Sequence, residues 1–296
     1  MSGEISNGLR TIGDVIRSHP LTRVEPTRAW LRFGWWVVLS RLFSELNVPW
    51  IEGQRLIVRR GMTGATGNVY LGLHEFMSMM LTLHFLREED LFLDVGANVG
   101  AYTVLASGVR RATTWAFEPD AATVHDLARN IEVNKLDRLV TIHAVALGPH
   151  DGEVSFTHGE GALNRVASGG DRNAHLVPQR SLDSILDGRS PAKIKLDVEG
   201  YEEQVLQGAV KTLANDTLKV ISIEGTTPAI LKQLADNGFE RAFYDPFTRV
   251  LQREPNELAY KDGVWTLSNE FYVRDWAFVE KRLDRAIPIT VFERDI

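Results

Sequence analysis

Residues 91–100 read LFLDVGANVG, and this stretch decides the fold. Its first part, Leu91–Val95, has the compact apolar composition of a buried strand, and the segment AYTVLASGV at 101–109 is predicted to be a helix. Between them, Gly96 and Gly100 let the backbone approach a ligand closely, beside the unpaired N–H groups of a helix N-terminus. The stretch therefore predicts a strand, a glycine loop and a helix, with both glycines among the ligand-binding residues.

Apolar runs alternate with helical patterns downstream of this loop. Further strands are predicted at 113–117, 140–145, 192–196 and 219–223. Strands separated by helices imply right-handed crossovers in a mainly parallel sheet, which binds its ligand at the carboxyl ends of the strands. Residues 151–180 are polar and glycine-rich, so we expect an insertion there, at most a hairpin with a loop. The predicted class is α/β, with a doubly wound, Rossmann-like sheet.

The spelling of the loop and the acids at two strand ends indicate the nucleotide. Asn98 replaces the second glycine of the G-x-G-x-x-G pattern of dinucleotide-binding proteins. Glu118 ends the second strand, where a carboxylate can accept hydrogen bonds from two ribose hydroxyls, and Asp94 is placed to meet a cationic group over the loop. Ala146 is expected to flank an adenine. A ribose joined to a positively charged amino-acid tail describes S-adenosylmethionine better than NAD, so these residues are the candidate cofactor contacts.

A second group of candidates follows the fourth and fifth predicted strands. Lys195, Asp197 and Glu199 lie at the end of one, and Glu224 lies at the end of the other, which brings all four beside the glycine loop. Such acids can act as a general base, clamp a cation or bind Mg²⁺. A cap on the next helix is the alternative for Glu199. We predict Asp197 to be the base or a metal ligand, with Glu224 beside it and Lys195 orienting a carboxylate or the acceptor. The candidate metal ligands are Asp197, Glu199 and Glu224.

Candidate substrate contacts come from two other segments. His74 and Glu75 stand near the start of a helix predicted over 73–86, and surface or capping positions are the alternative for both. The insertion supplies Asn164, Arg165, His158 and His175. No histidine spacing typical of a zinc site occurs, so neither histidine of the insertion is expected to bind a metal.

The first 72 residues are predicted to be an extension of a main domain that spans 73–296. An amphipathic helix is expected within 29–46. The apolar residues that fall on one of its faces are Leu31, Trp35, Val38, Leu39, Leu42 and Leu46. We expect this helix to dock on the core or on a second subunit of a homodimer, and contact with a membrane or a lipid-linked substrate is the alternative. Residues 53–72 read as hairpin strands and turns.

Composition excludes several classes of protein. Hydrophobic residues make up 44% and charged residues 24% of the 296, which excludes disorder as the main description. A net charge of −6 argues against a nucleic-acid partner and favours a small molecule or glycan. The absence of cysteine removes disulfides, thiolate nucleophiles and thiolate-ligated metals. The first twenty residues lack the apolar core of a secretory signal, and the run at 33–39 is too short to span a bilayer, so we expect a cytoplasmic protein.

Several blocks together resemble one known family. They are Asp94–Gly100, Phe117–Pro119, Asn130 with Asn134, Ile194–Glu202 with Leu206–Ala209, and Ile223–Glu224. Their order and spacing are similar to those of FkbM-like S-adenosylmethionine-dependent methyltransferases, over about Tyr70 to Arg249. The resemblance implies a class I methyltransferase fold with seven strands, the last antiparallel, and the last pair would be 239–244 and 270–273. It also implies O-methylation of a hydroxyl on a sugar, glycan or polyketide-like natural product, with acceptor choice residing in the N-terminal seventy residues and the tail after Arg253.

Two other functions compete with this interpretation. An NAD-dependent oxidoreductase or epimerase would use the same kind of sheet, but the loop spelling and the absence of a Tyr-x-x-x-Lys pair argue against it. A catalytically inactive scaffold with a methyltransferase fold is the other, and the intact Asp94, Gly96, Gly100 and Glu118 argue against that.

Overall fold

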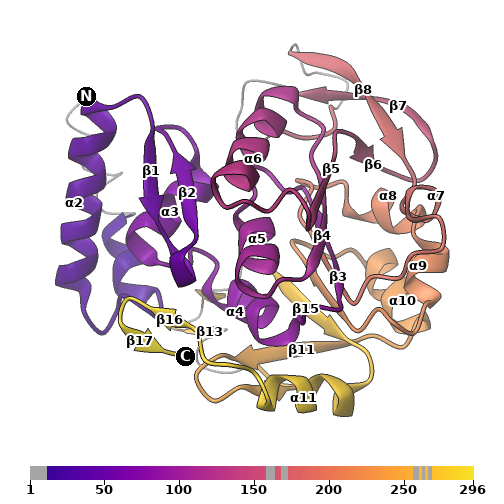
Figure 1. The fold of residues 1–296 in the computed structure, drawn as a ribbon. Helices are drawn as coiled ribbons and strands as arrows, with labels where there is room; N and C mark the ends of the chain where they lie inside the picture. Colours follow the sequence, from indigo (N-terminus) through magenta and orange to yellow (C-terminus); the bar gives the residue numbers. More distant parts are fainter. Residues whose placement is uncertain (1–11, 158–163, 168–172, 256–259, 262–263, 266–268) are drawn as a thin grey trace.

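The computed structural model describes residues 12–157, 164–167, 173–255, 260–261, 264–265 and 269–296. Its centre is an eight-stranded sheet of order β12-β11-β15-β10-β9-β3-β4-β5 (Figure 1). In that order the strands are Val250–Gln252, Glu240–Asp245, Glu270–Val273, Val220–Ile223, Lys193–Leu196, Leu91–Val95, Thr113–Phe117 and Val140–His143. The five strands from β10 to β5 run parallel, whereas β15 is antiparallel to both β10 and β11. The doubly wound sheet and its antiparallel strand are confirmed, and the short edge strand β12 is an addition.

The registers of the parallel strands align their carboxyl ends. Val95 pairs with both Phe117 and Leu196, and Leu196 pairs in turn with Ile223. The residues that follow these four are Gly96, Glu118, Asp197 and Glu224. Because the strands are parallel, all four residues leave the sheet at one edge, which is where such sheets bind ligands.

Helices cover both faces of the sheet. On one face lie α4 (Phe76–Phe85), the π-helical η2 (Val104–Val109) and α11 (Trp276–Asp284). On the other lie α7 (Leu182–Leu186), α8 (Glu202–Gln207), α9 (Val210–Ala214) and α10 (Pro228–Asp236). Phe92 and Leu93, which are neighbours on β3, belong to different clusters of buried residues, as the alternation of side chains along a strand requires. The short α5 (Ala101–Thr103) leads into η2, and Asp120 caps α6 (Ala121–Val133) by accepting a hydrogen bond from Thr123 N at 2.9 Å.

The helical pattern that follows β9 in the sequence forms two helices. α8 ends at Gln207 and α9 begins at Val210. The chain breaks at Gly208, where a Cβ atom would lie 2.1 Å from the carbonyl oxygen of Gly148. The close approach of the two backbones therefore interrupts a helical pattern that is continuous in sequence.

The N-terminal extension contains more helix than the sequence suggests. α2 (Pro26–Leu42) is followed by a hairpin of β1 (Leu46–Pro49) and β2 (Arg55–Val58) around the short η1 (Ile51–Gly53). The hairpin is confirmed, but the prediction of strands and turns up to residue 72 is wrong, because Thr63–Leu71 forms helix α3. Glycine disfavours helix, yet Gly67 leaves the space that the His74 ring occupies, since a Cβ there would lie 2.4 Å from Nδ1. Packing thus overrides the local propensity.

Two asparagines join this extension to the main domain. Asn130 Oδ1 accepts a hydrogen bond from Ile57 N at 2.8 Å, and Asn134 Oδ1 accepts one from Arg55 N at 2.8 Å. Asn134 Nδ2 also donates to Arg55 O at 2.8 Å. Side chains of α6 therefore satisfy the free edge of β2, and one cluster of buried residues runs from α2 and α3 to the glycine loop. The extension and the main domain share a core.

Of the three surfaces predicted for the apolar face of α2, the core is not the one that it meets. The helix packs on α3 through the face that buries Ala29 and Trp36, at the outer side of the molecule (Figure 1). The residues predicted to form one apolar face are turned away from the core, with Leu31 74% and Leu42 69% exposed, and Leu46 belongs to β1. The helix is apolar on two faces, so periodicity could not determine which one meets the core.

The insertion is the expected hairpin. β7 (Gly152–Thr157) pairs with β8 (Ala174–Arg180), and β6 (Ala146–Leu147) joins β8 to make a small three-stranded sheet. Two further short hairpins are β13 (Tyr260–Lys261) with β14 (Val264–Trp265) and β16 (Thr290–Val291) with β17 (Arg294–Asp295). Over the described residues, none of the helices combines the length and apolar character that a membrane span requires.

Candidate functional site

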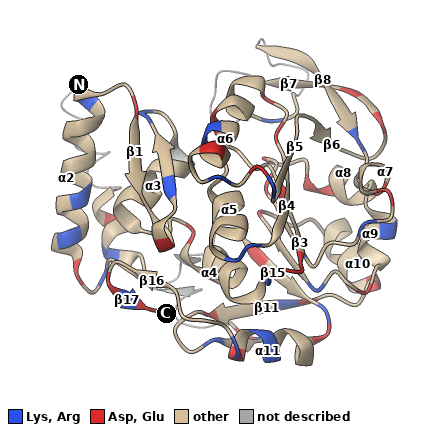
Figure 2. Cartoon of the chain, viewed as in Figure 1, with Lys and Arg blue, Asp and Glu red and all other residues tan. Residues whose placement is uncertain are grey.

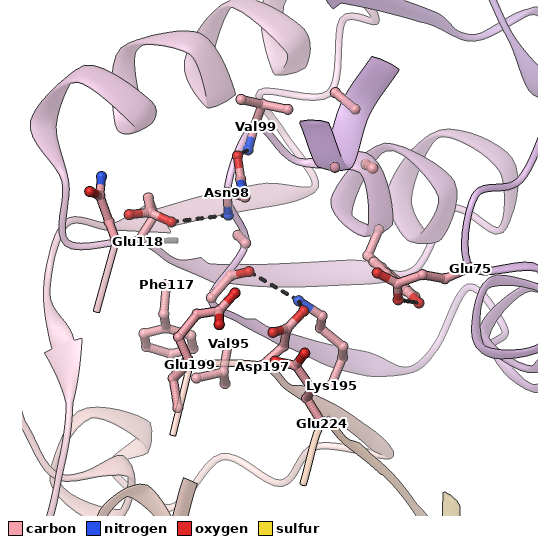
Figure 3. A pocket seen from close by; sticks show the side chains of 18 of the residues that line it. Glu75, Val95, Asn98, Val99, Phe117, Glu118, Lys195, Asp197, Glu199 and Glu224 are labelled. Atoms are coloured by element: carbon pink, nitrogen blue, oxygen red, sulfur yellow. Dashed lines mark hydrogen bonds and ion pairs between the residues drawn. The ribbon is translucent and has the colours of Figure 1, made fainter. Parts of the chain in front are cut away.

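A cavity of about 460 Å³ opens where the carboxyl ends of the strands meet the N-terminal extension. The predicted residues that line it are Gly96, Asn98, Glu118, Ala146, His74, Glu75, Asn164, Lys195, Asp197, Glu199 and Glu224. In Figure 3, Glu118 and Asn98 lie on one side and Glu75 on the other, with Lys195 and Asp197 between them. Asp94, Gly100 and Arg165 are not among the lining residues, and His158 lies outside the described residues. His175, on β8, does not line the cavity either.

The conformation of the loop requires glycine at positions 96 and 100. Gly96 has φ +73°, and a Cβ there would lie 1.8 Å from Asp197 O. Gly100 has φ +89°, and its Cβ would lie 2.4 Å from Leu127 Cδ1 of α6. The first glycine therefore lets the loop touch the β9 end, and the second lets α6 pack beneath it.

Glu118 receives two backbone hydrogen bonds at the end of β4. Its Oε2 accepts from Asn98 N at 3.0 Å, and its Oε1 accepts from Asp120 N at 3.0 Å. Burial raises the pKa of this carboxyl to about 7, against the lowering effect of both hydrogen bonds. The carboxylate is thus held rigidly at the cavity wall, where its remaining lone pairs can accept hydroxyl groups.

Asp94 does not reach the cavity. It is fully buried on β3, and its Oδ2 accepts a hydrogen bond from Thr103 Oγ1 at 2.6 Å. Burial raises the pKa of Asp94, although the positive charge of Lys195 opposes the shift. A direct contact between Asp94 and the amine of a ligand is therefore not what this geometry offers, and Asp94 instead ties the strand to the helix that follows the loop.

Lys195 links the loop to the acids. Its Nζ donates to Gly96 O at 3.0 Å and forms an ion pair with Asp197 Oδ2 at 2.9 Å. Burial alone would lower the pKa of Lys195, but the nearby carboxylates of Asp197 and Asp94 raise it above the ordinary value. Lys195 is thus a permanent cation that sets the distance between the glycine loop and Asp197.

Asp197 and Glu224 are joined by a side-chain hydrogen bond. The hydrogen bond to Asp197, followed by burial, raises the pKa of Glu224 well above its usual range. Burial would raise the pKa of Asp197 as well, but Lys195 and the hydrogen bond from Glu224 hold it below its ordinary value. At neutral pH the pair therefore consists of an ionised Asp197 and a protonated Glu224 that donates to it.

Glu199 completes a trio of acids that could hold a metal. Asp197, Glu199 and Glu224 each offer a carboxylate oxygen, and these oxygens all lie within 4.8 Å of one another. Glu199 has φ +54°, in a turn that Glu202 Oε1 holds by accepting hydrogen bonds from Val198 N at 3.0 Å and Gly200 N at 3.3 Å. Oxygen donors of this kind fit Mg²⁺, but the cation Lys195 and the proton of Glu224 already neutralise part of their charge.

Glu75 carries the opposite wall of the cavity. Its Oε2 accepts hydrogen bonds from Tyr102 Oη at 2.5 Å and from Asn269 Nδ2 at 2.8 Å. Lys195 Nζ lies 5.4 Å from the centre of the Tyr102 ring, so this network continues into the acid cluster. Beside it, the buried Nδ1 of His74 has no hydrogen-bond partner. His74 and Glu75 thus both line the cavity, and their contact with a substrate stays a prediction.

Several residues around the cavity were not predicted from the sequence. The extension contributes Ile12, Val15, Thr66 and Tyr70 to the cavity. Tyr102, in the helix after the loop, and Asn269, before β15, were missed as partners of Glu75. Tyr102 stands two residues after Gly100, and this proximity to the glycine loop is the signal in the sequence that could have indicated it. Nothing in the sequence links Asn269 to this site.

The strand order, the antiparallel β15, the glycine loop and the acid at the end of β4 define a Rossmann-like class I methyltransferase fold. Residues 94–242 match the Methyltransferase FkbM domain, which is half of the chain. The protein therefore belongs to the FkbM methyltransferase family.

Individual relatives are distant. The hexuronic acid methyltransferase AglP of Haloferax volcanii is 27% identical over 158 residues, which are 52% of this chain and 64% of AglP. The FkbM methyltransferase structure from Methylobacillus flagellatus aligns with a TM-score of 0.43 and 19% identity, over 66% of this chain and 47% of its own. A Pyrococcus abyssi tRNA (uracil-54, C5)-methyltransferase in complex with S-adenosyl-L-homocysteine aligns with a TM-score of 0.40 and 11% identity, over 78% and 44%. The chain thus spans less than two thirds of the relatives named first, and the fold assignment rests on its own strand order.

Proposed function

We propose that this protein transfers the methyl group of S-adenosylmethionine to a hydroxyl oxygen of a sugar, a glycan or a polyketide-like natural product. The observation that carries the proposal is that one cavity holds Glu118 at one end and the Lys195–Asp197–Glu224 group in the middle. A sugar acceptor is supported by the relative named a hexuronic acid methyltransferase.

The cofactor would lie along the glycine loop. Glu118 would accept hydrogen bonds from the two ribose hydroxyls, and Val145 and Ala146 would flank the adenine, since both line the cavity next to β4. Asn98 presents its side chain and backbone at the tip of the loop, with Oδ1 accepting from Val99 N at 2.7 Å. The adenine would be recognised by apolar contact with Val145 and Ala146 rather than by an acidic residue.

The ionised Asp197 is the candidate base. In the reaction an acceptor oxygen forms its bond to the methyl carbon, the carbon–sulfur bond breaks with its electrons going to sulfur, and the hydroxyl proton goes to Asp197. Lys195 fixes the Asp197 carboxylate through the 2.9 Å ion pair, and Glu224 donates to it. Glu75 and His74 would contact the acceptor from the opposite wall, and Asn164 would do so from the insertion.

A divalent cation is the second role proposed for the acids. It is supported by the convergence of Asp197, Glu199 and Glu224 within 4.8 Å. Binding would require the proton of Glu224 to leave, so a calorimetric Mg²⁺ titration should show proton release that depends on the buffer. Unchanged turnover after exhaustive chelation, together with a flat titration, would rule this role out.

The first test is a thermal melt with S-adenosylhomocysteine, and NAD serves as the control ligand. A ligand at about 100 times its dissociation constant adds ~2.7 kcal/mol, which should raise the midpoint by several degrees for a chain of this size. A rise with S-adenosylhomocysteine alone supports the proposal. A rise with NAD alone would favour the oxidoreductase, and no rise with either would favour the inactive scaffold.

A further inference from the structure

Helix α2 carries an exposed apolar ridge. The α2 ridge consists of Leu31, Trp35, Val38, Leu42 and Phe43, which are 47–74% exposed. The first four recur at intervals of three and four residues and so lie on one side of the helix. The opposite side is apolar as well and is buried on the extension through Ala29 and Trp36. Because a helix that is apolar on both sides is normally covered on both, the ridge indicates a partner.

The charge of the helix indicates which partner. α2 contains Arg28, Arg32 and Arg41 and no acidic residue, although the whole chain has a net charge of −6 (Figure 2). Arg28 and Arg41 are exposed beside the ridge, near its two ends. Arg28 forms ion pairs with Glu25 at 3.3 Å and with Glu293 at 3.5 Å. Arg41 donates a hydrogen bond to Val37 O of its own helix at 2.9 Å. Two carboxylates thus neutralise Arg28, and Arg41 supplies the exposed positive charge beside the ridge.

We propose that the α2 ridge binds the surface of a bilayer that contains anionic phospholipids. The helix would lie in the plane of the interface, with the ridge among the acyl chains and the arginines at the phosphate groups. At 17 residues the helix is about 25 Å long, and it lies on the membrane rather than across it. A second copy of this chain fits less well, because two-fold pairing would set arginines against arginines with no acid on either helix.

Membrane binding through this helix would leave two helices, α2 and α3, between the bilayer and the cavity. α2 packs on α3, and Gly64, Thr66 and Tyr70 of α3 line the cavity. The ridge and the cavity wall are therefore opposite sides of one two-helix layer. This inference goes beyond the proposed function and does not depend on it, since binding can be measured without turnover.

Sedimentation with vesicles tests the inference. The full chain is mixed with vesicles of phosphatidylcholine containing 30% phosphatidylglycerol, or with pure phosphatidylcholine vesicles. We expect preferential binding to the anionic vesicles, weakened about tenfold or more in the double variant Leu31→Gln/Leu42→Gln. The matched control is Leu176→Gln/Val210→Gln, which changes residues that are 66% and 61% exposed on β8 and α9, and should bind as the wild type does. Arg41→Gln should reduce the preference for anionic vesicles.

Three results would overturn the inference. They are absence of wild-type binding to anionic vesicles, equal binding of the ridge variant and the wild type, and equal weakening in the control. Light scattering of the eluted protein addresses the second-copy alternative. A wild-type dimer that becomes a monomer in the ridge variant would assign the ridge to that dimer instead. The melting shift with S-adenosylhomocysteine should be the same in every variant, which shows that the fold and the cavity are intact.

Discussion

At the scale of single residues, the carboxyls of the site divide by environment. Glu118 is buried and pairs only with backbone N–H groups, whereas Asp197 stands against a lysine. Burial raises the pKa of Glu118 to about 7 against the weaker effects of two backbone hydrogen bonds and Lys195, whereas the direct ion pair with Lys195 holds the pKa of Asp197 low. One acid therefore titrates near neutrality and the other stays ionised, although both follow strands of the same sheet.

Cofactor affinity should consequently depend on pH. Ribose hydroxyls donate to the ionised form of Glu118, so protonation below its pKa of about 7 should weaken binding, toward a tenfold loss per unit well below that value. Calorimetric titration with S-adenosylhomocysteine between pH 5.5 and 8 measures this. In Glu118→Gln the affinity should be lower at pH 8, by about tenfold or more, and nearly independent of pH. A wild-type affinity that does not change over this range would contradict the assigned role.

Replacing the base should separate binding from turnover. Asp197→Asn keeps the shape of the side chain but removes its proton affinity, so turnover should fall by roughly 10²–10⁴ while S-adenosylhomocysteine affinity stays within a few-fold. Methyl transfer from labelled cofactor and calorimetry measure the two quantities. Asp236→Asn, on the exposed end of α10, is the control and should keep both. Wild-type turnover in Asp197→Asn would remove Asp197 from the mechanism.

At the scale of elements, Gly96 of the glycine loop is required more by the lack of space for a Cβ atom than by its positive φ. Gly96 and Gly188 both have positive φ, +73° and +83°, but a Cβ at 96 would meet Asp197 O at 1.8 Å, whereas one at 188 would meet nothing within 4 Å. Gly188→Ala should thus cost about 1–2 kcal/mol, the strain of the left-handed conformation alone. Gly96→Ala should lower the melting temperature much further or prevent folding. Equal melting temperatures of the two variants would show that the loop backbone can shift to accommodate the Cβ atom at little cost.

The sequence predicts elements well where one interaction determines them. The strands β3, β4, β9 and β10 are short and are followed directly by an acid or a glycine, and the helices between them predict the parallel topology. α3 was not predicted because Gly67 makes room for the His74 ring, a contact that no local pattern shows. The side of α2 that faces outward could not be predicted, because both sides of the helix are apolar.

The candidate site could likewise be predicted where the strand order determines it, and not where it depends on contacts between distant segments. Glu118, Asp197 and Glu224 follow strands whose registers align, so their convergence could be inferred from topology. Asn269 reaches Glu75 from 194 positions away, and this pairing depends on how β15 closes the sheet. Asp94 was misplaced because the end of a strand indicates an edge of the sheet but not the direction of the side chain, which here points to Thr103.

At the scale of the whole molecule, a buried lysine lowers the stability that the core provides. Lys193 is fully buried on β9, and its Nζ donates to Ser222 Oγ on the neighbouring strand. Burial lowers its pKa to about 7, with Asp94 opposing and Lys195 adding to the shift. The unfolded chain holds this proton up to a pKa near 10.5, so folding releases it between these values. The penalty is complete below pH 7 and disappears as the pH rises toward 10.5.

Lys193→Met should therefore stabilise the protein, and more so at low pH. Methionine fills a similar volume without a charge, and replacing a buried charge with an apolar group commonly adds about 1–4 kcal/mol, which corresponds to several degrees in melting temperature. The gain should be larger at pH 6 than at pH 9, because at pH 9 the folded wild type already holds a neutral lysine. Lys211→Met on the exposed side of α9 should change the melting temperature little at either pH. A Lys193→Met protein that melts below the wild type at both pH values would mean that the bond to Ser222 and the charge near Asp94 outweigh the cost of burial.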